Sequence, residues 1–204
     1  MPEVLVPAAR WPRWLENFES SHGVTTLETR DGALRGDAVD GSWFRARLPF
    51  SVEYDGPPDA ARFGDSVGPP PSWGVLLVRK GGFAIARVEH ARVVESKVGQ
   101  RHVQGRTKAG GQSQQRFARR RANQARDAYE AAAGHAARIL AGVEHVVAGG
   151  DRGAVTEVLT DARLGGVTLV GTWHAVPDPR RAVLDKVVAD AQAFAVEVEN
   201  APAG

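Results

Sequence analysis

Residues 73–99, WGVLLVRKGGFAIARVEHARVVESKVG, decide the fold of the larger part of this chain. An apolar run at 73–78 is separated from a second run at 83–88 by a Lys-Gly-Gly turn at 80–82, and an alternating stretch follows at 91–97. Each run is short and rich in β-branched residues, which favours strands over helices. The segment therefore predicts three strands in a meander.

The sequence changes to helical spacing after this meander. The segment 113–140 is rich in alanine and contains no proline, and Gly142 offers a stop. Its apolar positions recur every three or four residues, as expected for one face of a long helix. These positions are Ala118, Ala122, Ala125, Tyr129, Ala132, Ala136 and Leu140.

The part of the chain before the meander predicts smaller elements. Apolar residues at helical spacing in 10–22 indicate a short amphipathic helix. Two or three short antiparallel strands should follow, because the Asp-Gly pairs at 31–32 and 40–41 are turn signals. The proline run at 69–71 cannot donate ladder hydrogen bonds and marks a boundary.

The part after the long helix has an α/β rhythm. We expect a strand at 144–150, a helix at 153–160, a strand at 166–174 and a helix at 179–197. The apolar face of the last helix would consist of Val183, Leu184, Val187, Val188, Ala191, Phe194 and Ala195. The predicted class is α/β (α+β), with helices packed on a mixed sheet. The predicted domains are an N-terminal extension of helix and short strands at 1–70 and a main domain at 73–200.

Composition excludes several classes of protein. There is no cysteine, so a disulfide scaffold and a thiolate metal site are both excluded. The six histidines lack metal-ligand spacing, and no phosphate-binding glycine motif is present, so we expect no metal and no cofactor. No secretory leader or membrane-spanning run is visible, so we expect a cytoplasmic protein without a membrane partner. We also expect a monomer.

The formal net charge of +2 hides a strongly basic segment. Residues 96–126 contain nine of the 26 Lys and Arg residues and no Asp or Glu. The rest of the chain therefore has 17 basic and 24 acidic residues, a balance of −7. This pattern predicts a local contact with a polyanion.

The centre of the basic segment is residues 105–121, GRTKAGGQSQQRFARRR. Gly110 and Gly111 permit positive φ and a close approach of the backbone to a ligand. Gln112 does not ionise near neutral pH and is a poor general base. Its catalytic use would be to hold a water, or to place a backbone N–H, beside an electrophilic carbonyl.

This stretch resembles the catalytic domain of the eukaryotic and archaeal class I peptide release factors. Those proteins have a Gly-Arg-x-Gly-Gly-Gln-Ser segment that leads into an Arg-Phe-Ala-Arg-x-Arg helix. The matching positions here are Gly105, Arg106, Gly110, Gly111, Gln112, Ser113, Arg116, Phe117, Ala118, Arg119 and Arg121. The extra Thr107, Lys108 and Ala109 suggest a slightly longer loop. The more similar branch is that of the Vms-type release-factor-like proteins, which has bacterial members, and the resemblance extends over about 73–197.

The resemblance implies a fold like the middle domain of release factors and hydrolysis of peptidyl-tRNA in the ribosomal peptidyl transferase centre. Gln112 would orient the water, and Gly110 and Gly111 would shape the backbone around it. The partners would be the large ribosomal subunit, its rRNA and peptidyl-tRNA, and not DNA. The residues expected to contact RNA phosphates are Arg101, Arg106, Lys108, Arg116, Arg119, Arg120 and Arg121.

The family's full-length members also have a codon-reading domain, and the sequence contains no motif for reading a stop codon. We therefore expect a codon-independent factor that frees nascent chains from stalled ribosomes or large subunits. Two alternatives are a nuclease that cleaves the tRNA acceptor end and a noncatalytic ribosome-binding module. Intact tRNA with a free 3′ hydroxyl distinguishes ester hydrolysis from cleavage of the tRNA, and the intact Gly-Gly-Gln motif argues against the noncatalytic module.

Overall fold

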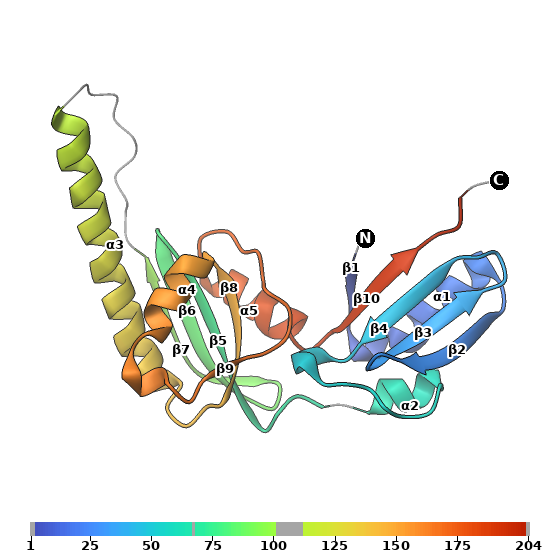
Figure 1. Ribbon diagram of the computed structural model, residues 1–204. Coiled ribbons are helices and arrows are strands. Elements are labelled where there is room, and N and C mark those ends of the chain that lie inside the picture. Colours follow the sequence, from blue (N-terminus) through green and yellow to red (C-terminus); the bar gives the residue numbers. More distant parts are fainter. Residues whose placement is uncertain (1–2, 67, 101–111, 203–204) are drawn as a thin grey trace. The chain divides into compact units, whose positions relative to one another are not determined.

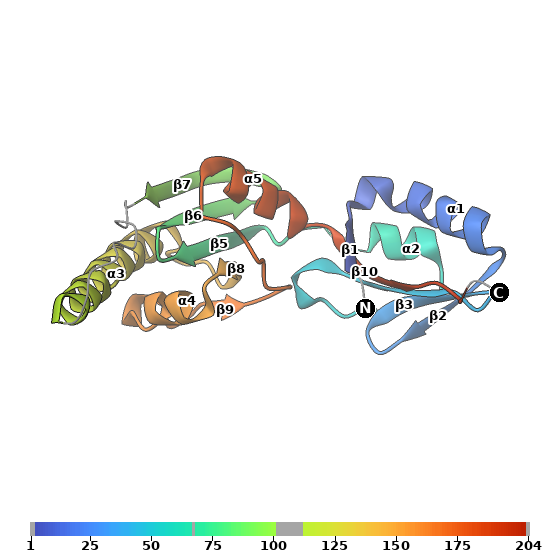
Figure 2. The ribbon, with the colours of Figure 1, turned by 90° about the horizontal axis from the view of Figure 1, so that it is seen from above.

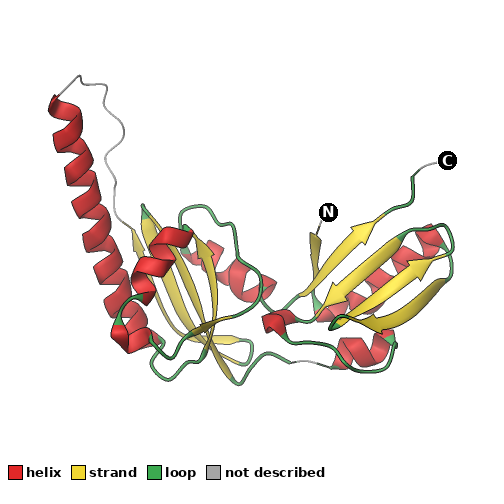
Figure 3. Cartoon of the chain, viewed as in Figure 1, coloured by secondary structure: helices red, strands yellow, loops and turns green. Residues whose placement is uncertain are grey.

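The computed structural model describes residues 3–66, 68–100 and 112–202, which form two compact units. Unit 1 consists of Met1–Pro69 together with Val188–Gly204, and unit 2 is Pro70–Val187. Each unit has its own five-stranded sheet with helices packed on it, so the predicted α+β class is confirmed (Figure 1, Figure 3). The last residues of the chain thus belong to unit 1, although the sequence predicted a main domain that extends to residue 200.

Unit 1 is built on an antiparallel sheet in the order β1-β10-β4-β3-β2. The Asp31-Gly32 pair, with both residues at positive φ, joins β2 to β3 as the sequence predicted. The two α-helices lie on the same face of the sheet (Figure 2). The elements are β1 (Glu3–Val6), η1 (Ala8–Arg10), α1 (Trp11–His22), β2 (Thr25–Arg30), β3 (Ala33–Ala38), β4 (Trp43–Arg47), η2 (Pro49–Ser51), α2 (Ala60–Asp65) and β10 (Phe194–Glu199).

Trp11 lies at the centre of the core of unit 1. Its side chain is 1% exposed, and its ring contacts those of Phe44, Phe63 and Phe194 at centroid distances of 5.9, 5.2 and 5.6 Å. The indole N–H donates a hydrogen bond of 2.8 Å to the carbonyl oxygen of Ala60, so the buried polar atom is satisfied. The amphipathic helix predicted at 10–22 is therefore confirmed and packs through aromatic side chains.

Unit 2 contains a mixed sheet in the order β7-β6-β5-β8-β9, in which β5, β6 and β7 form the predicted meander. Both faces of β5 are covered, because α3 and α4 lie on one face of the sheet and α5 lies on the other (Figure 2). This explains why the apolar run at 73–78 is continuous and does not alternate. The elements are β5 (Ser72–Arg79), β6 (Gly82–Glu89), β7 (Arg92–Gln100), α3 (Gln112–Ile139), β8 (His145–Gly150), α4 (Arg152–Leu159), η3 (Ala162–Leu164), β9 (Thr168–Leu169) and α5 (Arg181–Asp190).

The predicted helix at 179–197 is wrong in its second half. The helix α5 ends at Asp190, and the next residues form β10, which pairs with both β1 and β4. The sequence FAVEVE alternates as a strand does: Phe194 and Val196 are buried in the core of unit 1, and Glu197 lies on the other face. A central strand gains ladder hydrogen bonds on both sides, and these favour β structure here.

The predicted strand at 166–174 is also shorter than expected. Only Thr168–Leu169 form β9, and His174 makes an isolated bridge with Gly149 farther along β8. Gly171, with φ of +73°, interrupts the extended backbone between these two pairings. The chain from 170 to 180 is therefore a loop over the carboxyl end of β8.

An ion-pair network on β10 predicts a pH-dependent stability of unit 1. The Glu197 carboxylate accepts hydrogen bonds from Arg47 at 2.7 Å and from Arg45 at 2.6 and 3.0 Å. These bonds, the one from Arg47 foremost, hold the pKa of Glu197 below its ordinary value of 4.5. Because the pKa is lower in the folded state, the stabilisation is complete above about pH 4.5 and disappears as the pH falls through the folded value.

We therefore expect Glu197→Gln to lower the free energy of unfolding of unit 1 by roughly 1 kcal/mol at neutral pH. The difference from wild type should shrink on acidification below pH 4.5. Denaturant unfolding at a series of pH values measures it. Glu199→Gln, an exposed position on the same strand, is the matched control. An equal loss in both variants would contradict a specific contribution from the network.

Candidate active site

The Gly-Gly-Gln motif follows β7 in the chain and ends at Gln112, the first residue of α3. Gln100, the last residue of β7, pairs with Gly82, the first residue of β6. The chain therefore leaves the sheet beside the β5–β6 turn, and it re-enters regular structure at Gln112, the first residue of α3. The strand and the helix predicted on either side of the connection are confirmed, and the connection itself lies outside the described residues.

The helix α3 is anchored to unit 2 by its carboxyl-terminal half. Ala132, Ala136 and Ile139 are fully buried, and Tyr129 packs against the same cluster. Burial raises the pKa of Tyr129 above its ordinary value of 10.0, so the phenol stays neutral. A helix of 28 residues is about 42 Å long. Its amino-terminal half extends past the end of the sheet, away from the anchored turns (Figure 1, Figure 2).

Further contacts fix the direction of α3 on the meander. The ring of His135 lies 5.6 Å from that of Phe83 on β6, and Arg138 pairs with Glu95 on β7. The Arg138 ion pair is exposed and contributes little energy. Phe83 itself passes so close to Gly99 that a Cβ there would lie 2.4 Å from its ring. The end of β7 and the base of α3 are therefore packed against the same residue of β6.

Several predicted site residues lie outside the described part of the chain. They are Arg101, Arg106, Lys108, Gly110 and Gly111. The backbone of the others belongs to the projecting half of α3, and their side chains lie outside what the structure describes. These are Gln112, Arg116, Arg119, Arg120 and Arg121. Their chemical roles remain predictions, and what the structure adds is their position on the amino-terminal half of α3.

The structure gathers a second cationic group that the sequence did not indicate. Arg79 ends β5, Arg152 begins α4, and Trp173 lies in the loop after β9. The Arg152 guanidinium lies 4.3 Å from the centre of the Trp173 ring. Because the three residues are far apart in the chain, no local signal linked them. A check of the charged residues that directly follow the strands predicted at 73–78 and 144–150 could have paired Arg79 with Arg152.

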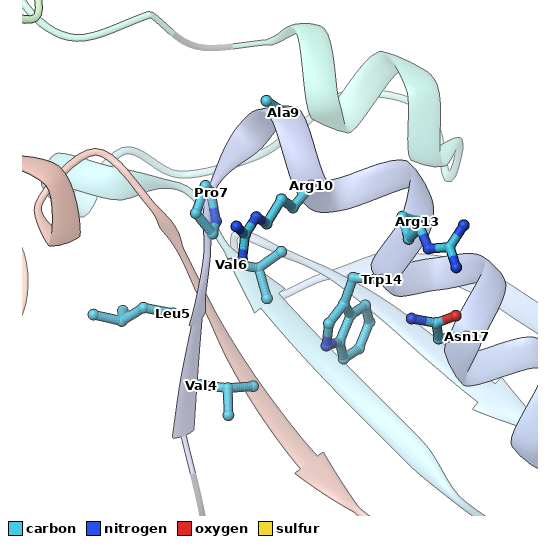
Figure 4. A pocket seen from close by; sticks show the side chains of 9 residues that line it. All are labelled: Val4, Leu5, Val6, Pro7, Ala9, Arg10, Arg13, Trp14 and Asn17. Atoms are coloured by element: carbon cyan, nitrogen blue, oxygen red, sulfur yellow. The ribbon is translucent and has the colours of Figure 1, made fainter.

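A groove of about 600 Å³ in unit 1 is a weaker candidate for an active site. It lies between β1 and α1, with Trp14 on one side and Val4 and Leu5 on the other, and Arg10 and Arg13 are on the helix (Figure 4). The residues that line it include no carboxylate and no histidine. Since arginine does not act as a base in proteins, this groove provides no group to activate water.

Two further features bear on the class of site. Within residues 3–66, 68–100 and 112–202, no group of three or more His, Asp or Glu side chains could hold a metal ion. None of the described helices combines the length and the hydropathy that a bilayer span requires.

Comparison with known proteins identifies one family. Residues 71–197 match a family model described as Actinobacteria/chloroflexi VLRF1 release factor. The match covers more than half of the chain, contains the Gly-Gly-Gln motif and extends from β5 into β10. No curated protein matches the chain.

Proposed function

Since the chain belongs to the family of Actinobacteria/chloroflexi VLRF1 release factors, we propose that it hydrolyses the ester bond of peptidyl-tRNA on stalled ribosomes or large subunits, independently of the codon. The family itself gives a release-factor-like function in ribosome rescue, as the motif's resemblance to bacterial Vms-type proteins indicated. The proposal adds the reaction, the residues that carry it and the RNA contacts.

The observation that carries the proposal is the position of Gln112 at the start of a projecting helix. The peptidyl-tRNA ester lies deep in the large subunit, so a catalyst must extend a narrow element to reach it. The helix α3 begins at Gln112, and among the residues whose side chains the structure describes, those near its carboxyl end anchor it to the sheet. This geometry supports Gln112 as the leading residue of the protein at the ester.

The chemistry asked of the protein is limited to positioning. The oxygen of a water attacks the ester carbonyl carbon, and the bond from that carbon to the ribose 3′ oxygen breaks. The 3′ oxygen takes one proton of the water and the other is released to solvent, which leaves a free peptide carboxylate and a tRNA with a 3′ hydroxyl. The Gln112 amide orients the water or stabilises the developing charge, and Gly110 and Gly111 allow the close approach.

Charge supports RNA contact by unit 2. Unit 1 contains seven Lys and Arg against fourteen Asp and Glu residues, a balance of −7, and unit 2 contains 19 against ten, a balance of +9. Counterion release from phosphates therefore favours unit 2 as the RNA-binding part. The proposed contacts around the motif are Arg101, Arg106, Lys108, Arg116, Arg119, Arg120 and Arg121.

The acidic balance of unit 1 also supports independence from the codon, because a unit with excess negative charge is repelled by mRNA and by the rRNA around it. We expect the same release rate with a stop codon, a sense codon or no codon at the site of action. Stalled ribosomes and isolated large subunits with a labelled nascent chain provide the substrates. Release that requires a stop codon would contradict this part of the proposal.

Product chemistry tests the reaction itself. The tRNA recovered after release should have full length and accept an amino acid again, since hydrolysis leaves its 3′ hydroxyl intact. A shortened tRNA would instead indicate a nuclease. Binding without release of peptide would indicate a noncatalytic module.

A further inference from the structure

The strands β5, β7 and β8 of unit 2 run in the same direction and finish at one end of the sheet, here called its carboxyl end. This end contains an ordered group of two arginines and a tryptophan. Arg79 donates a hydrogen bond of 2.7 Å to the carbonyl oxygen of Val176, which ties β5 to the loop after β9. Trp173 donates to the carbonyl oxygen of Gly150 at 3.3 Å, and the guanidinium of Arg152 lies over its ring. The three side chains therefore come from three segments and meet around the end of β8.

Gly150 makes this arrangement possible. Its φ is +95°, and a Cβ there would lie 2.3 Å from the carbonyl oxygen of Val78 and 3.1 Å from the Cγ of Arg79. Only glycine allows the backbone to turn here without pushing Arg79 away. The next residue, Asp151, donates its N–H to Val78 at 2.8 Å and accepts from the first turn of α4 at 3.0 Å, which fixes Arg152. The backbone thus fixes where both arginine side chains begin, and contacts with Val176 and Trp173 place their guanidinium groups.

Both guanidinium groups keep their charge available. Among the described residues, neither Arg79 nor Arg152 forms an ion pair with a carboxylate. Stacking on an indole occupies the face of a guanidinium and leaves its N–H groups free at the edge, which is where phosphate oxygens bind. Two acids lie at this end of the sheet, Asp178 beside Gly81 and Asp151 at the cap of α4, and Lys80 adds a third cation next to Gly81 in the chain. The net charge at this end is positive.

We propose that Arg79 and Arg152 bind phosphates of an RNA backbone, with Trp173 as the residue that positions Arg152. This inference rests on the proposed function, because it takes RNA as the polyanion that unit 2 meets. The connection to the Gly-Gly-Gln motif begins at Gln100, beside Gly82 at this same end of the sheet. An RNA that surrounds α3 therefore passes close to these cations. The phosphates belong either to rRNA or to the acceptor arm of tRNA.

The test compares two double variants that remove the same charge. Arg79→Gln with Arg152→Gln removes the proposed contacts. Arg92→Gln with Arg163→Gln is the control, since Arg92 begins β7 at the opposite end of the sheet and Arg163 lies in η3 beyond the carboxyl end of α4. The measurement is the affinity for purified large subunits, and separately for deacylated tRNA, over a range of salt concentrations.

For the first pair we expect the plot of the logarithm of the association constant against the logarithm of the salt concentration to become shallower, its negative slope losing about one to two units in magnitude. The affinity near 0.1 M salt should fall about tenfold or more. The control pair should keep the slope of wild type, because charges beyond about 10 Å are screened at this salt. A change seen with large subunits assigns the phosphates to rRNA, and a change seen with tRNA assigns them to tRNA. Equal slopes for the two pairs with both RNAs would overturn the proposal.

Two further variants test whether a loss of RNA affinity comes from the missing charge, from altered side-chain geometry or from misfolding. Arg79→Lys with Arg152→Lys should keep the slope and lose part of the affinity, because lysine keeps the charge without the planar fork. Trp173→Phe should also weaken binding without changing the slope. A Lys pair with the reduced slope of the Gln pair would overturn the assignment of phosphate contact to these charges.

Peptide release by the wild-type protein is assayed independently. A protein that releases no peptide but shows the expected difference in slope would refute hydrolysis and support the RNA contact. Wild-type release together with equal slopes for the two pairs would refute the RNA contact and leave hydrolysis standing.

Discussion

Replacement of Gln112 by alanine should slow peptide release about 100- to 1,000-fold while binding to the large subunit stays close to that of wild type. The amide of Gln112 is proposed to act on the attacking water or on the developing charge, so its contribution belongs to the transition state. Loss of such an interaction lowers the rate constant of the chemical step and leaves substrate affinity intact.

The measurement is single-turnover release of a labelled nascent chain from stalled large subunits, with binding measured in parallel. Gln115→Ala is the matched control, because it removes the same side chain one helical turn further along the same helix. It should release peptide at nearly the wild-type rate. Release by Gln112→Ala at the wild-type rate would show that the assignment of Gln112 is wrong.

The second large effect is expected at the base of α3. Ala136 is fully buried in the cluster that joins α3 to the sheet of unit 2, so Ala136→Asp places a carboxylate among apolar side chains. We expect a loss of about 3 to 5 kcal/mol in the free energy of unfolding of unit 2, because a buried, unpaired charge is not solvated. Release should be lost with it, since the helix that presents Gln112 is no longer anchored.

Ala131→Asp controls for the substitution itself. Ala131 is exposed on the same helix, and aspartate there costs less than about 1 kcal/mol through helix propensity alone. Denaturant unfolding followed by circular dichroism distinguishes the two variants. Similar losses in the free energy of unfolding at both positions would contradict the view that the buried face of α3 anchors the helix to the sheet.

Much of the fold followed from local patterns. The meander at 73–99 and the helix that begins at 112 were predicted with nearly correct bounds, because alternation and helical spacing are properties of short segments. The motif was recognised in the same way, from adjacent residues. The structure shows that the helix that begins at Gln112 extends past the end of the sheet (Figure 1). No pattern of neighbouring residues predicts this extension.

The sequence alone determined the meander, the long helix, the basic segment and the motif with its family resemblance, since each depends on neighbours in the chain. Tertiary structure decided that 194–199 is a strand, because its alternating residues gain partners in β1 and β4 of unit 1. It also decided that Arg79, Arg152 and Trp173 meet. Their meeting depends on parallel pairing of β5 with β8 and on the backbone turn at Gly150, and both are contacts between segments far apart in sequence.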